Sequence, residues 1–436
     1  MESINILYKA FSKGATICTD TRAISSGCIF FALKGTNFNG NQFAPQALAQ
    51  GAALAVVDED QNLVDERFVR VSDVLTCLQQ LALHHRKQLK IPFVGITGSN
   101  GKTTTKELVN KVFSKKYKTL CTQGNLNNHI GVPLTLLSVT SQHEMAIIEM
   151  GANHQKEIEL LCSLALPSHV LITNVGRAHL EGFGGFEGVK KGKGEMYEFA
   201  KTYHSMVIIN GDNPYLKEML GNYAHTVSYG MRETNNIYGK LLPANEYVKL
   251  EWSVNGSNQM HTIHSHITGD YNFENILSAI SLGVHFGVPS ASINEAIEGY
   301  VPDNQRSQEI ILGRTKIILD AYNANPSSME AALKNFSTGF TGKKAVFLGD
   351  MLELGDTSTQ EHQSIIELAR SIKPDLLILV GPNFKEAGKG ISAIYFDSSA
   401  QASRWSAEQN FTNFNILIKG SRGSKMEVIL EGITSA

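Results

Sequence analysis

A glycine-bracketed loop that leads into a lysine and two threonines is the clearest chemical feature of this sequence. Residues 93–104 read FVGITGSNGKTT, which is a short apolar strand, the loop, and then Lys102, Thr103 and Thr104. Backbone N–H groups of such a loop converge on anionic oxygens, and the dipole of a following helix favours negative charge there. Lys102 adds a cation, and Thr103 adds a hydroxyl ligand for Mg²⁺. The pattern therefore predicts a phosphate-binding loop rather than an ordinary strand-to-helix turn.

The loop departs from the general phosphate-loop pattern in one respect, because Ile96 stands where that pattern has its first glycine. The context still fits, since Leu108, Val109, Val112 and Phe113 recur at helical spacing after the loop. The residues predicted to hold phosphate are Gly98, Ser99, Asn100, Gly101, Lys102, Thr103 and Thr104.

Two side chains with metal-binding chemistry follow other apolar strands. Glu149 lies near the end of the buried strand AIIEM, and His179 follows a strand at 170–173. In open α/β sheets, ligands gather at the carboxyl ends of the strands, where a carboxylate can hold Mg²⁺. We favour a metal ligand at Glu149 over a salt-bridged edge residue, because a phosphate loop usually needs a metal partner. His179 falls in the same layer of the predicted sheet.

Two polar loops are candidates for holding a substrate. In the first, Asp20 and Arg22 could bind hydrogen-bonding edges or a diphosphate, and Phe38 could stack on a planar group. A surface turn is the alternative there. The second loop, 122–133, places three asparagines, a glutamine and a histidine between glycines. Such a loop is either solvated or grips a substrate, and the residue types alone leave both interpretations open.

The helix that begins near residue 272 carries two asparagines. Asn272 and Asn275 lie one helical turn apart, and we expect them on the exposed side, where they can hydrogen-bond a planar group such as a purine. Capping of the helix by Asn272 is the alternative. The preceding segment, 225–268, alternates polar and apolar residues and predicts antiparallel hairpins. Its histidines at 261, 264 and 266 have no carboxylate or cysteine beside them, so we interpret them as solvated strand residues.

Strands and helices alternate in the last third of the chain. This alternation predicts a second doubly wound α/β domain. Its first strand leads into Asp320 and a polar loop, and Ser327 and Glu330 have the spacing of a capping box for the next helix. Lys419 and Arg422 fall on the same rim of the predicted sheet and are either carboxylate-binding residues or surface charges.

Length and composition describe an ordinary globular protein. At 436 residues the chain is too long for one core, and two or three domains are expected. The formal charge of −2 gives no positive field for nucleic acid or membrane surfaces, and no apolar run reaches the ~20 residues of a membrane span. Five scattered cysteines without a CxxC pair indicate a reducing compartment and argue against disulfides and zinc. We therefore expect a cytoplasmic protein.

Taken together, these motifs resemble those of the Mur ligases, the ATP-dependent amide-bond ligases of peptidoglycan precursor synthesis. The resemblance covers essentially the whole length and is strongest for the member that joins D-alanyl-D-alanine to UDP-N-acetylmuramoyl-tripeptide. It rests on TGSNGKTTTKE at 97–107, GNLNNHIGVPLTLL at 124–137, EMGANH at 149–154, NVGRAHLEGFG at 174–184, KGE at 193–195 and DAYNANPSS at 320–328.

The resemblance implies a fold of three α/β domains. These are a UDP-substrate domain over 1–90, a central ATPase-like domain with a parallel sheet over 91–303, and a Rossmann-like domain over 304–436. The last domain is implied to bind the incoming dipeptide and to close over ATP. The resemblance further implies ATP, two Mg²⁺ sites, a carbamate formed from CO₂, and UDP-N-acetylmuramoyl-tripeptide and D-alanyl-D-alanine as substrates. We expect a monomer.

The metal ligands that the resemblance implies are Thr103 and Glu149 for one Mg²⁺ and His179 and carbamylated Lys193 for the other. Lys193 matches the lysine that is carbamylated in this family. Lys191 is the alternative, although the Gly-Glu pair that follows Lys193 favours Lys193. Together with Lys102 on the phosphates, His179 and Lys193 carry the implied catalytic roles.

The resemblance also implies contacts to ATP and to the other substrates. Asn275 resembles the adenine-contacting asparagine, and Arg306 and Asp320 resemble the C-terminal residues that close over ATP. The implied substrate-binding residues are Thr19, Asp20, Arg22, Gly35, Phe38, Asn39, Asn125, Asn128, His129, Tyr322, Asn323, Asn325, Lys419, Ser421 and Arg422.

Two other interpretations compete with this one. A sister ligase with another acceptor, either the one that adds the third peptide residue or a folate polyglutamate ligase, would use the same ATP chemistry. The motifs at 124–137 and 320–328 argue against both, and the Asp-Asn-Pro at 212–214 lacks the arginine of the first sister's motif. The second interpretation is a nucleotide-driven switch that hydrolyses ATP to move domains, which leaves the asparagine- and histidine-rich loops unexplained.

Overall fold

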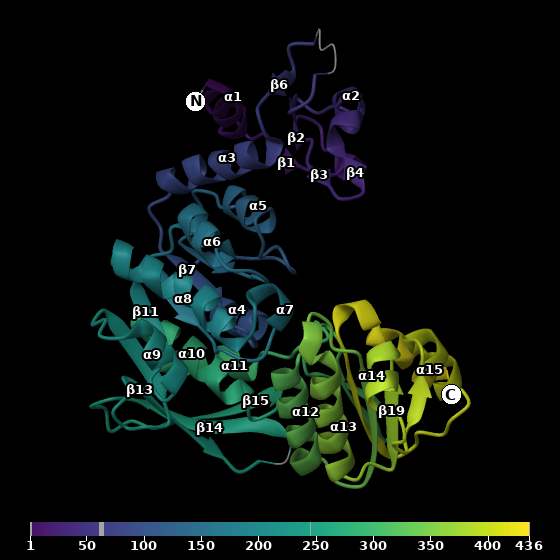
Figure 1. Cartoon of the computed structure of the whole chain (residues 1–436). Helices are drawn as coiled ribbons and strands as arrows, with labels where there is room; N and C mark the ends of the chain where they lie inside the picture. The colour runs from purple at the N-terminus through teal and green to yellow at the C-terminus, as the bar shows by residue number, and fades with distance from the viewer. Residues whose placement is uncertain (1, 61–64, 245, 436) are drawn as a thin grey trace. The chain divides into compact units, whose positions relative to one another are not determined.

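We describe a computed structural model of the chain, which covers residues 2–60, 65–244 and 246–435 (Figure 1). The chain divides into two compact units. One contains residues 1–95, 118–151 and 159–168, and the other contains residues 96–117, 152–158 and 169–436. The described elements form three main sheets in succession, with helices between the strands, so the predicted α/β class is confirmed. The domain boundaries after residues 90 and 303 stay predictions.

The first unit contains a four-stranded parallel sheet in the order β1-β2-β5-β6. Phe30 and Val57 on these strands pack with Cys28 and Leu48 into one buried cluster. A short antiparallel hairpin, β3–β4, follows β2. The elements are α1 (Glu2–Phe11), β1 (Ile17–Cys18), β2 (Ile29–Phe31), β3 (Lys34–Gly35), β4 (Phe38–Asn39), α2 (Ala44–Ala49), β5 (Leu54–Val57), β6 (Phe68–Arg70), α3 (Val74–Gln88), β8 (Thr119–Cys121), α5 (Gly131–Leu137) and β9 (Met145–Glu149).

The largest sheet has nine strands in the order β15-β14-β13-β12-β11-β10-β7-β9-β8. Among its strands in the second unit, β10 to β13 are parallel, and β13, β14 and β15 are antiparallel. The prediction of antiparallel hairpins is therefore confirmed for β13 to β15 and wrong for β12. Parallel strands need a crossover connection, and α9 supplies it between β11 and β12. The alternation of polar and apolar residues does not distinguish a parallel strand from an antiparallel one.

The other elements of the central part of the chain are the remaining strands of this sheet and the helices that connect them. They are β7 (Phe93–Thr97), α4 (Lys102–Phe113), α6 (Glu157–Ala165), β10 (His169–Ile172), α7 (Leu180–Phe183), α8 (Phe186–Tyr203), β11 (Met206–Asn210), α9 (Pro214–Leu220), β12 (Thr226–Gly230), β13 (Ile237–Leu242), β14 (Tyr247–Val254), β15 (His261–Thr268), α10 (Asn272–His285) and α11 (Ser290–Glu298).

The strand β15 ends the nine-stranded sheet, and side chains of α11 bind to its outer edge. Asn294 Nδ2 donates to the carbonyl oxygen of Thr262 at 3.3 Å, and Glu298 Oε1 accepts from the amide of His264 at 2.9 Å. Ile263 and Ile267 are buried while His264 and His266 are exposed, as the alternation of this segment predicts. The edge of the sheet is therefore covered by hydrogen bonds from a helix.

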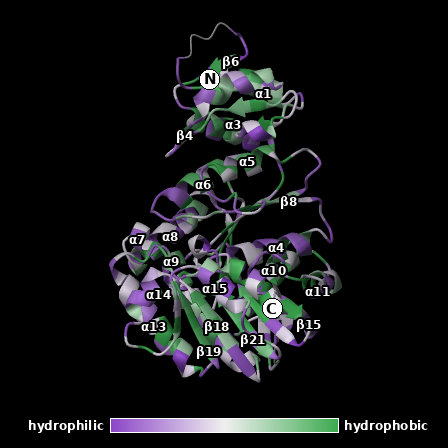
Figure 2. Cartoon of the chain, turned by 90° about the vertical axis from the view of Figure 1, so that its right-hand side faces the viewer, coloured by the Kyte–Doolittle hydropathy of each residue, from purple (hydrophilic) through white to green (hydrophobic). Residues whose placement is uncertain are grey.

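The C-terminal sheet has the order β16-β17-β21-β18-β19-β20, and only β16 is antiparallel to its neighbour. Its strands appear largely in the green of hydrophobic residues in Figure 2, and Ile317, Phe347, Ile378 and Ile416 lie in its core. The elements are β16 (Gln308–Leu312), β17 (Thr315–Asp320), α12 (Pro326–Gly339), β18 (Lys343–Gly349), α13 (Ser358–Ser371), β19 (Leu376–Val380), α14 (Pro382–Ala387), β20 (Ile394–Phe396), α15 (Ser399–Ser406), β21 (Phe414–Lys419) and α16 (Ile429–Ser435).

The capping box predicted at the start of α12 is wrong by two residues. Asn325 is the N-cap, and its Oδ1 accepts from the backbone N–H of Ser328 at 2.9 Å. Ser328 Oγ in turn accepts from the backbone N–H of Asn325 at 3.0 Å. Pro326 occupies the first helical position, where its missing N–H costs nothing, so the helix begins earlier than the Ser327–Glu330 spacing predicts.

Two histidines meet at the amino-terminal end of β10, with His169 Nε2 and His285 Nε2 3.1 Å apart. One neutral ring can donate to the other, but two imidazolium rings would repel one another. Burial lowers the pKa of His169 to about 4, and the charges of His285 and His225 add to this. In the unfolded chain a histidine has a pKa of about 6.5.

We expect the folded state to lose stability as the pH falls from about 6.5 towards 4, because the unfolded chain then binds protons that the folded chain does not. The loss from His169 should be of the order of 2 kcal/mol. The measurement is the thermal midpoint at pH 7.5 and pH 5 for the wild type and for His169→Gln. A variant with the same pH dependence as the wild type would contradict the prediction.

Candidate active site

The predicted phosphate loop connects β7 to α4, and its two outer glycines have backbone angles that side chains rarely adopt. The φ angle is +144° at Gly98 and +79° at Gly101. A Cβ atom on Gly101 would overlap the side-chain oxygen of Asn275. The glycines therefore let the chain turn tightly into the helix, so that the first N–H groups of α4 point at the loop.

The side chains of the loop are held around this turn. Lys102 Nζ donates to the carbonyl oxygens of Gly98, at 2.7 Å, and Ser99, at 3.2 Å, so its charge lies directly at the loop. Ser99 Oγ accepts from the backbone N–H of Gly176 at 2.9 Å. Thr103 is buried and Thr104 half-buried in the first turn of α4. A cation and several backbone N–H groups thus converge at one place, as an anion site requires.

Asn272 and Asn275 are buried, so the prediction that they lie on the exposed side of their helix is wrong. Thr105 Oγ1, on α4, donates to Asn275 Oδ1 at 3.1 Å, and Asn275 Nδ2 donates to Asn272 Oδ1 at 2.7 Å. The helical spacing was correct, but α4 covers this face of α10, and a single helix does not reveal its neighbour. Asn272 does not cap the helix either, because the N-cap residue is Tyr271.

The loop that follows β10 contacts the phosphate loop and the start of the C-terminal sheet's first helix. Asn174 Oδ1 accepts from the backbone N–H of Asn100 at 3.0 Å. Arg177 forms ion pairs with Glu330 on α12 and Glu361 on α13, at 3.3 and 3.1 Å. His179 Nδ1, later in the same loop, pairs with the carboxylate of Glu353.

This last contact fixes the charge of the carboxylate. The hydrogen bond from His179 is the main reason that the pKa of Glu353 lies below its ordinary value. Glu353 belongs to the loop after β18, at the carboxyl end of a parallel strand where ligand-binding side chains gather. It is a residue that the predicted site did not include, and its position at that strand end was the available signal.

Lys193 lies on α8 and is the most deeply buried of the candidate catalytic side chains, with 1 % of it exposed. Its Nζ donates to the carbonyl oxygen of Ala152 at 3.2 Å. Burial holds the pKa of this amine well below its ordinary value, and the positive charge of Lys102 lowers it further. Lys191, the alternative, is exposed. A neutral amine is the form that reacts with CO₂, so the environment of Lys193 suits carbamylation.

The donor atoms of the predicted metal ligands can be compared with what Mg²⁺ prefers. In the first unit, Glu149 is buried at the end of β9, and Asn127 Nδ2 donates to its Oε1 at 2.8 Å. In the second unit Thr103 offers a hydroxyl. Oxygen donors of this kind fit Mg²⁺. His179 and an unmodified Lys193 offer only nitrogen, so that pair fits Mg²⁺ only if a carbamate supplies the oxygens. Among the described residues, no three histidine, cysteine or acidic side chains gather as a metal cluster.

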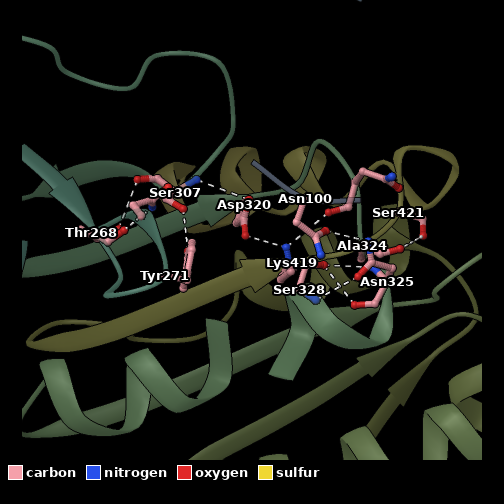
Figure 3. Close-up of polar contacts among 12 residues, drawn as sticks. Asn100, Thr268, Tyr271, Ser307, Asp320, Ala324, Asn325, Ser328, Lys419 and Ser421 are labelled. Atoms are coloured by element: carbon pink, nitrogen blue, oxygen red, sulfur yellow. Dashed lines mark hydrogen bonds and ion pairs between the residues drawn. The ribbon is translucent and has the colours of Figure 1, made fainter. Parts of the chain in front are cut away.

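Several of the predicted residues of the C-terminal segment, among them Asp320, Asn325, Lys419 and Ser421, make polar contacts that Figure 3 shows. Asp320 and Lys419 point toward one another, with Oδ2 and Nζ 2.5 Å apart, and Lys419 Nζ also donates to the carbonyl oxygen of Asn323. The guanidinium of Arg306 lies 3.7 Å from the centre of the Tyr322 ring. From the sequence, Lys419 is either a carboxylate-binding residue or a surface charge. That alternative is wrong, since only 2 % of its side chain is exposed and its partner is a carboxylate of the protein itself.

Two further predicted residues lie on the same rim of the C-terminal sheet. Ser421 Oγ donates to the carbonyl oxygen of Ala324 at 3.2 Å. Arg422 is exposed and donates to the side chains of Gln305 and Glu427 at 3.2 Å. Arg422 is therefore the more accessible of the two cations that the sequence placed on this rim.

The substrate residues predicted near the N-terminus lie in the first unit. Arg22 forms a two-pronged ion pair with Asp20, whose pKa is lowered to about 2 mainly by hydrogen bonds from Arg22. Phe38 is 58 % exposed beside Gly35 on the β3–β4 hairpin, and Asn39 Nδ2 donates to Glu59 at 2.9 Å. Thr19 is half-buried just before the ion pair. An exposed ring beside fixed charges suits a planar, charged ligand.

The asparagine-rich loop of the first unit divides into structural and exposed residues. Asn128 Oδ1 accepts from the backbone N–H groups of Ile130 and Gly131, at 3.1 and 2.9 Å, just before α5. Asn125 and His129 are exposed. Asn127, which the predicted site omitted, is the asparagine of this loop that binds the carboxylate of Glu149. Asn125 and Asn128 lie beside Asn127 in the same loop, so the sequence alone does not show which of the three asparagines binds Glu149.

Comparison with known proteins identifies the family. Profiles described as the Mur ligase family catalytic domain, the Mur ligase middle domain and the Mur ligase glutamate ligase domain match residues 15–86, 96–283 and 305–422. The UDP-N-acetylmuramoyl-tripeptide--D-alanyl-D-alanine ligases of Bacillus subtilis and Escherichia coli are each 33 % identical to this chain. The first covers 96 % of this chain and 92 % of its own length, and the second 96 % and 93 %.

Solved structures agree with the sequences. A crystal structure of MurF from Acinetobacter baumannii matches with a TM-score of 0.88 at 30 % identity, over 97 % of this chain and 93 % of that one. MurF from Thermotoga maritima in complex with ADP matches with a TM-score of 0.86 at 25 % identity, over 97 % and 99 %. Because relatives at this identity span nearly the whole of both chains, the chain belongs to the Mur ligase family.

Proposed function

We propose that this protein is an ATP-dependent ligase that joins D-alanyl-D-alanine to UDP-N-acetylmuramoyl-tripeptide, a step of peptidoglycan precursor synthesis. The observation that carries the proposal is the full-length similarity to ligases of this name at 33 % identity. The buried, weakly basic Lys193 beside the charge of Lys102 supports it, because this pairing suits a carbamylated lysine near a phosphate site.

The phosphate loop and Lys102 bind ATP in this proposal. The relative from Thermotoga maritima was solved with ADP, which supports a nucleotide as the ligand of the matching loop. Asn275, Arg306 and Asp320 contact the nucleotide. The contacts of Asn275 with Thr105 and of Asp320 with Lys419 hold these side chains in place before the ligand arrives.

Two Mg²⁺ ions would complete the site: Thr103 and Glu149 would hold one, and His179 and carbamylated Lys193 would hold the other. When bound, they neutralise the charge that repels a carboxylate from the phosphates of ATP. The oxygen donors of Thr103 and Glu149 support the first assignment, and the low pKa of Lys193 supports the carbamate on which the second depends.

The reaction proceeds in two steps. The terminal carboxylate of the tripeptide attacks the γ-phosphorus of ATP, so that ADP leaves and an acyl phosphate forms. The free amine of D-alanyl-D-alanine then attacks the acyl carbon, phosphate leaves with the bonding electron pair, and the nitrogen loses a proton as the amide forms. Water would hydrolyse the acyl phosphate, so we expect residues 304–436 to close over ATP during turnover.

The remaining candidate residues bind the other substrates in this proposal. Thr19, Asp20, Arg22, Gly35, Phe38 and Asn39 contact the UDP group, and the exposed Phe38 ring supports stacking there. The peptide contacts fall on Asn125, Asn128, His129, Tyr322, Asn323, Ser421 and Arg422, with Lys419 acting through Asp320.

The location and assembly of the enzyme are part of the proposal. We expect the protein to work in the cytoplasm as a monomer. The five buried cysteines are free thiols, which suits a reducing compartment. Among the described residues, no helix has both the length and the apolar character needed to cross a membrane.

The experiment is release of phosphate by the purified chain with Mg²⁺ and ATP, with the product mass recorded in parallel. We expect release only when UDP-N-acetylmuramoyl-tripeptide and D-alanyl-D-alanine are both present, and a product heavier than the donor by one dipeptide less water. Omitting each co-substrate in turn is the control.

Two results would overturn the proposal, and each would indicate a different function. Release that requires a single amino acid in place of the dipeptide would identify a sister ligase. Release that depends on neither co-substrate would identify a nucleotide-driven switch.

A further inference from the structure

The side chain of Asn325 makes one hydrogen bond more than its place in the fold requires. As the N-cap of α12, it needs only an acceptor, and Oδ1 accepts from the backbone N–H of Ser328 at 2.9 Å. Serine or aspartate would serve a cap equally well. The amide nitrogen of Asn325 instead donates to Asn100 Oδ1, in the phosphate loop, at 2.8 Å. Capping therefore does not explain why this residue is an asparagine, whereas the contact with Asn100 does.

The backbone of Asn100 is already fixed by the loop after β10. Its N–H donates to Asn174 Oδ1 at 3.0 Å, and its carbonyl oxygen accepts from Thr173 Oγ1 at 2.6 Å and from Asn174 Nδ2 at 3.1 Å. The side-chain oxygen is the part of Asn100 that a residue of the C-terminal segment reaches. Asn325 therefore adds the last constraint on a residue that stands directly before the left-handed Gly101.

A second contact brings the same helix start to the same loop. The backbone N–H of Arg177 donates to Ser327 Oγ at 3.0 Å. A Cβ atom on Gly176 would lie 3.1 Å from Ser327 Oγ and 3.3 Å from Asn100 Nδ2, so these three groups are packed closely. Figure 3 shows the contact between Asn325 and Asn100, with Ser328 bonded to Asn325. The amino-terminal turn of α12 thus rests on the phosphate loop and on the loop beside it.

We infer that Asn325 is a positioning residue for ATP, which fixes the phosphate loop from the C-terminal segment through the side chain of Asn100. In this role Asn325 touches neither ATP nor the reacting atoms. This positioning role takes the place of the direct substrate contact that the family resemblance implies for Asn325. Nucleotide affinity then depends on the docking of α12. The inference rests on the proposed use of ATP.

The test variant is Asn325→Ser, which keeps a good N-cap and removes only the donor to Asn100. Loss of one such hydrogen bond should weaken ADP binding and raise the KM for ATP by about fivefold. The KM for UDP-N-acetylmuramoyl-tripeptide should not change. The affinity is measured by equilibrium titration of the full chain with ADP, so this readout does not require turnover.

Ser328→Ala is the matched control, because it removes the reciprocal half of the same capping box without touching Asn100. We expect it to leave the affinity for ADP unchanged and to shift the thermal midpoint about as much as Asn325→Ser does. A fall in ADP affinity in Ser328→Ala equal to that in Asn325→Ser would assign the effect to the helix cap and overturn the inference.

A double variant tests whether Asn325 acts through Asn100. Asn100→Ala will weaken nucleotide binding by itself, and adding Asn325→Ser should then cause no further loss. Full additivity of the two effects would overturn the inference, as would an altered KM for the peptide substrate alone. Wild-type protein that binds ADP but does not ligate would overturn the proposed function and leave this result intact, whereas wild-type protein that does not bind ADP would overturn both.

Discussion

Replacing Lys193 by alanine is expected to reduce ligation by more than about a hundredfold, because it removes the proposed carbamate, which would hold one of the Mg²⁺ ions that neutralise the phosphates. Small carboxylic acids such as formate or acetate should restore part of the activity, since they can supply oxygens in its place. Phosphate release is the measurement, with and without the added acid. Wild-type turnover in Lys193→Ala would exclude this lysine from the reaction.

Lys191→Ala provides the matched control, because Lys191 stands two residues away on the same helix and is exposed. We expect near wild-type turnover from it. Removal of dissolved CO₂ and bicarbonate should lower the activity of the wild type reversibly and should not affect Lys193→Ala. A result in which Lys191→Ala loses activity and Lys193→Ala keeps it would assign the carbamate to the other lysine.

Replacing Lys419 by methionine is expected to destabilise the protein by about 2–3 kcal/mol, because it leaves the carboxylate of Asp320 without its cation in a site that is largely closed to water. Lys419 Nζ and Asp320 Oδ2 are 2.5 Å apart, and the exposed fractions of the two side chains are 2 % and 14 %. The KM for ATP should rise as well, because Asp320 is the proposed nucleotide contact. Denaturant unfolding and the ATP dependence of phosphate release measure the two effects.

Lys385→Met is the control for this variant. Lys385 pairs with Asp397 at 2.7 Å, but both side chains are more than half exposed, so its removal should change stability by less than about 0.5 kcal/mol. Asp320→Asn in the Lys419→Met background should recover part of the lost stability, since it removes the unpaired charge. If Lys419→Met loses no more stability than Lys385→Met, the buried ion pair contributes no more to stability than an exposed one, and the prediction is wrong.

The local sequence predicted those parts of the fold that local patterns determine. The strand, loop and helix of residues 93–113 appear where glycine spacing and apolar period place them. The alternation of strands and helices predicted for the last third of the chain is likewise confirmed. β16 departs from the predicted doubly wound pattern, because it is antiparallel and partly exposed at the edge of the C-terminal sheet.

The parts that could not be predicted depend on neighbours distant in the sequence. Asn275 is buried because α4 covers it, and Lys419 is buried because Asp320, 99 residues away, pairs with it. Glu353 faces His179 across 174 residues. The family resemblance, and not the spacing of the lysines, singles out Lys193 as the carbamylated residue. The structure adds a physical reason, because burial lowers the pKa of this lysine.

The hydrogen bonds from α11 to the outer edge of β15 have a consequence for the protein in concentrated solution. A bare strand edge offers its N–H and carbonyl groups to any other extended chain, which is how sheets from separate molecules join. Asn294 and Glu298 already occupy two of these groups. These two backbone groups of β15 are therefore not available for pairing with the strand of a second molecule.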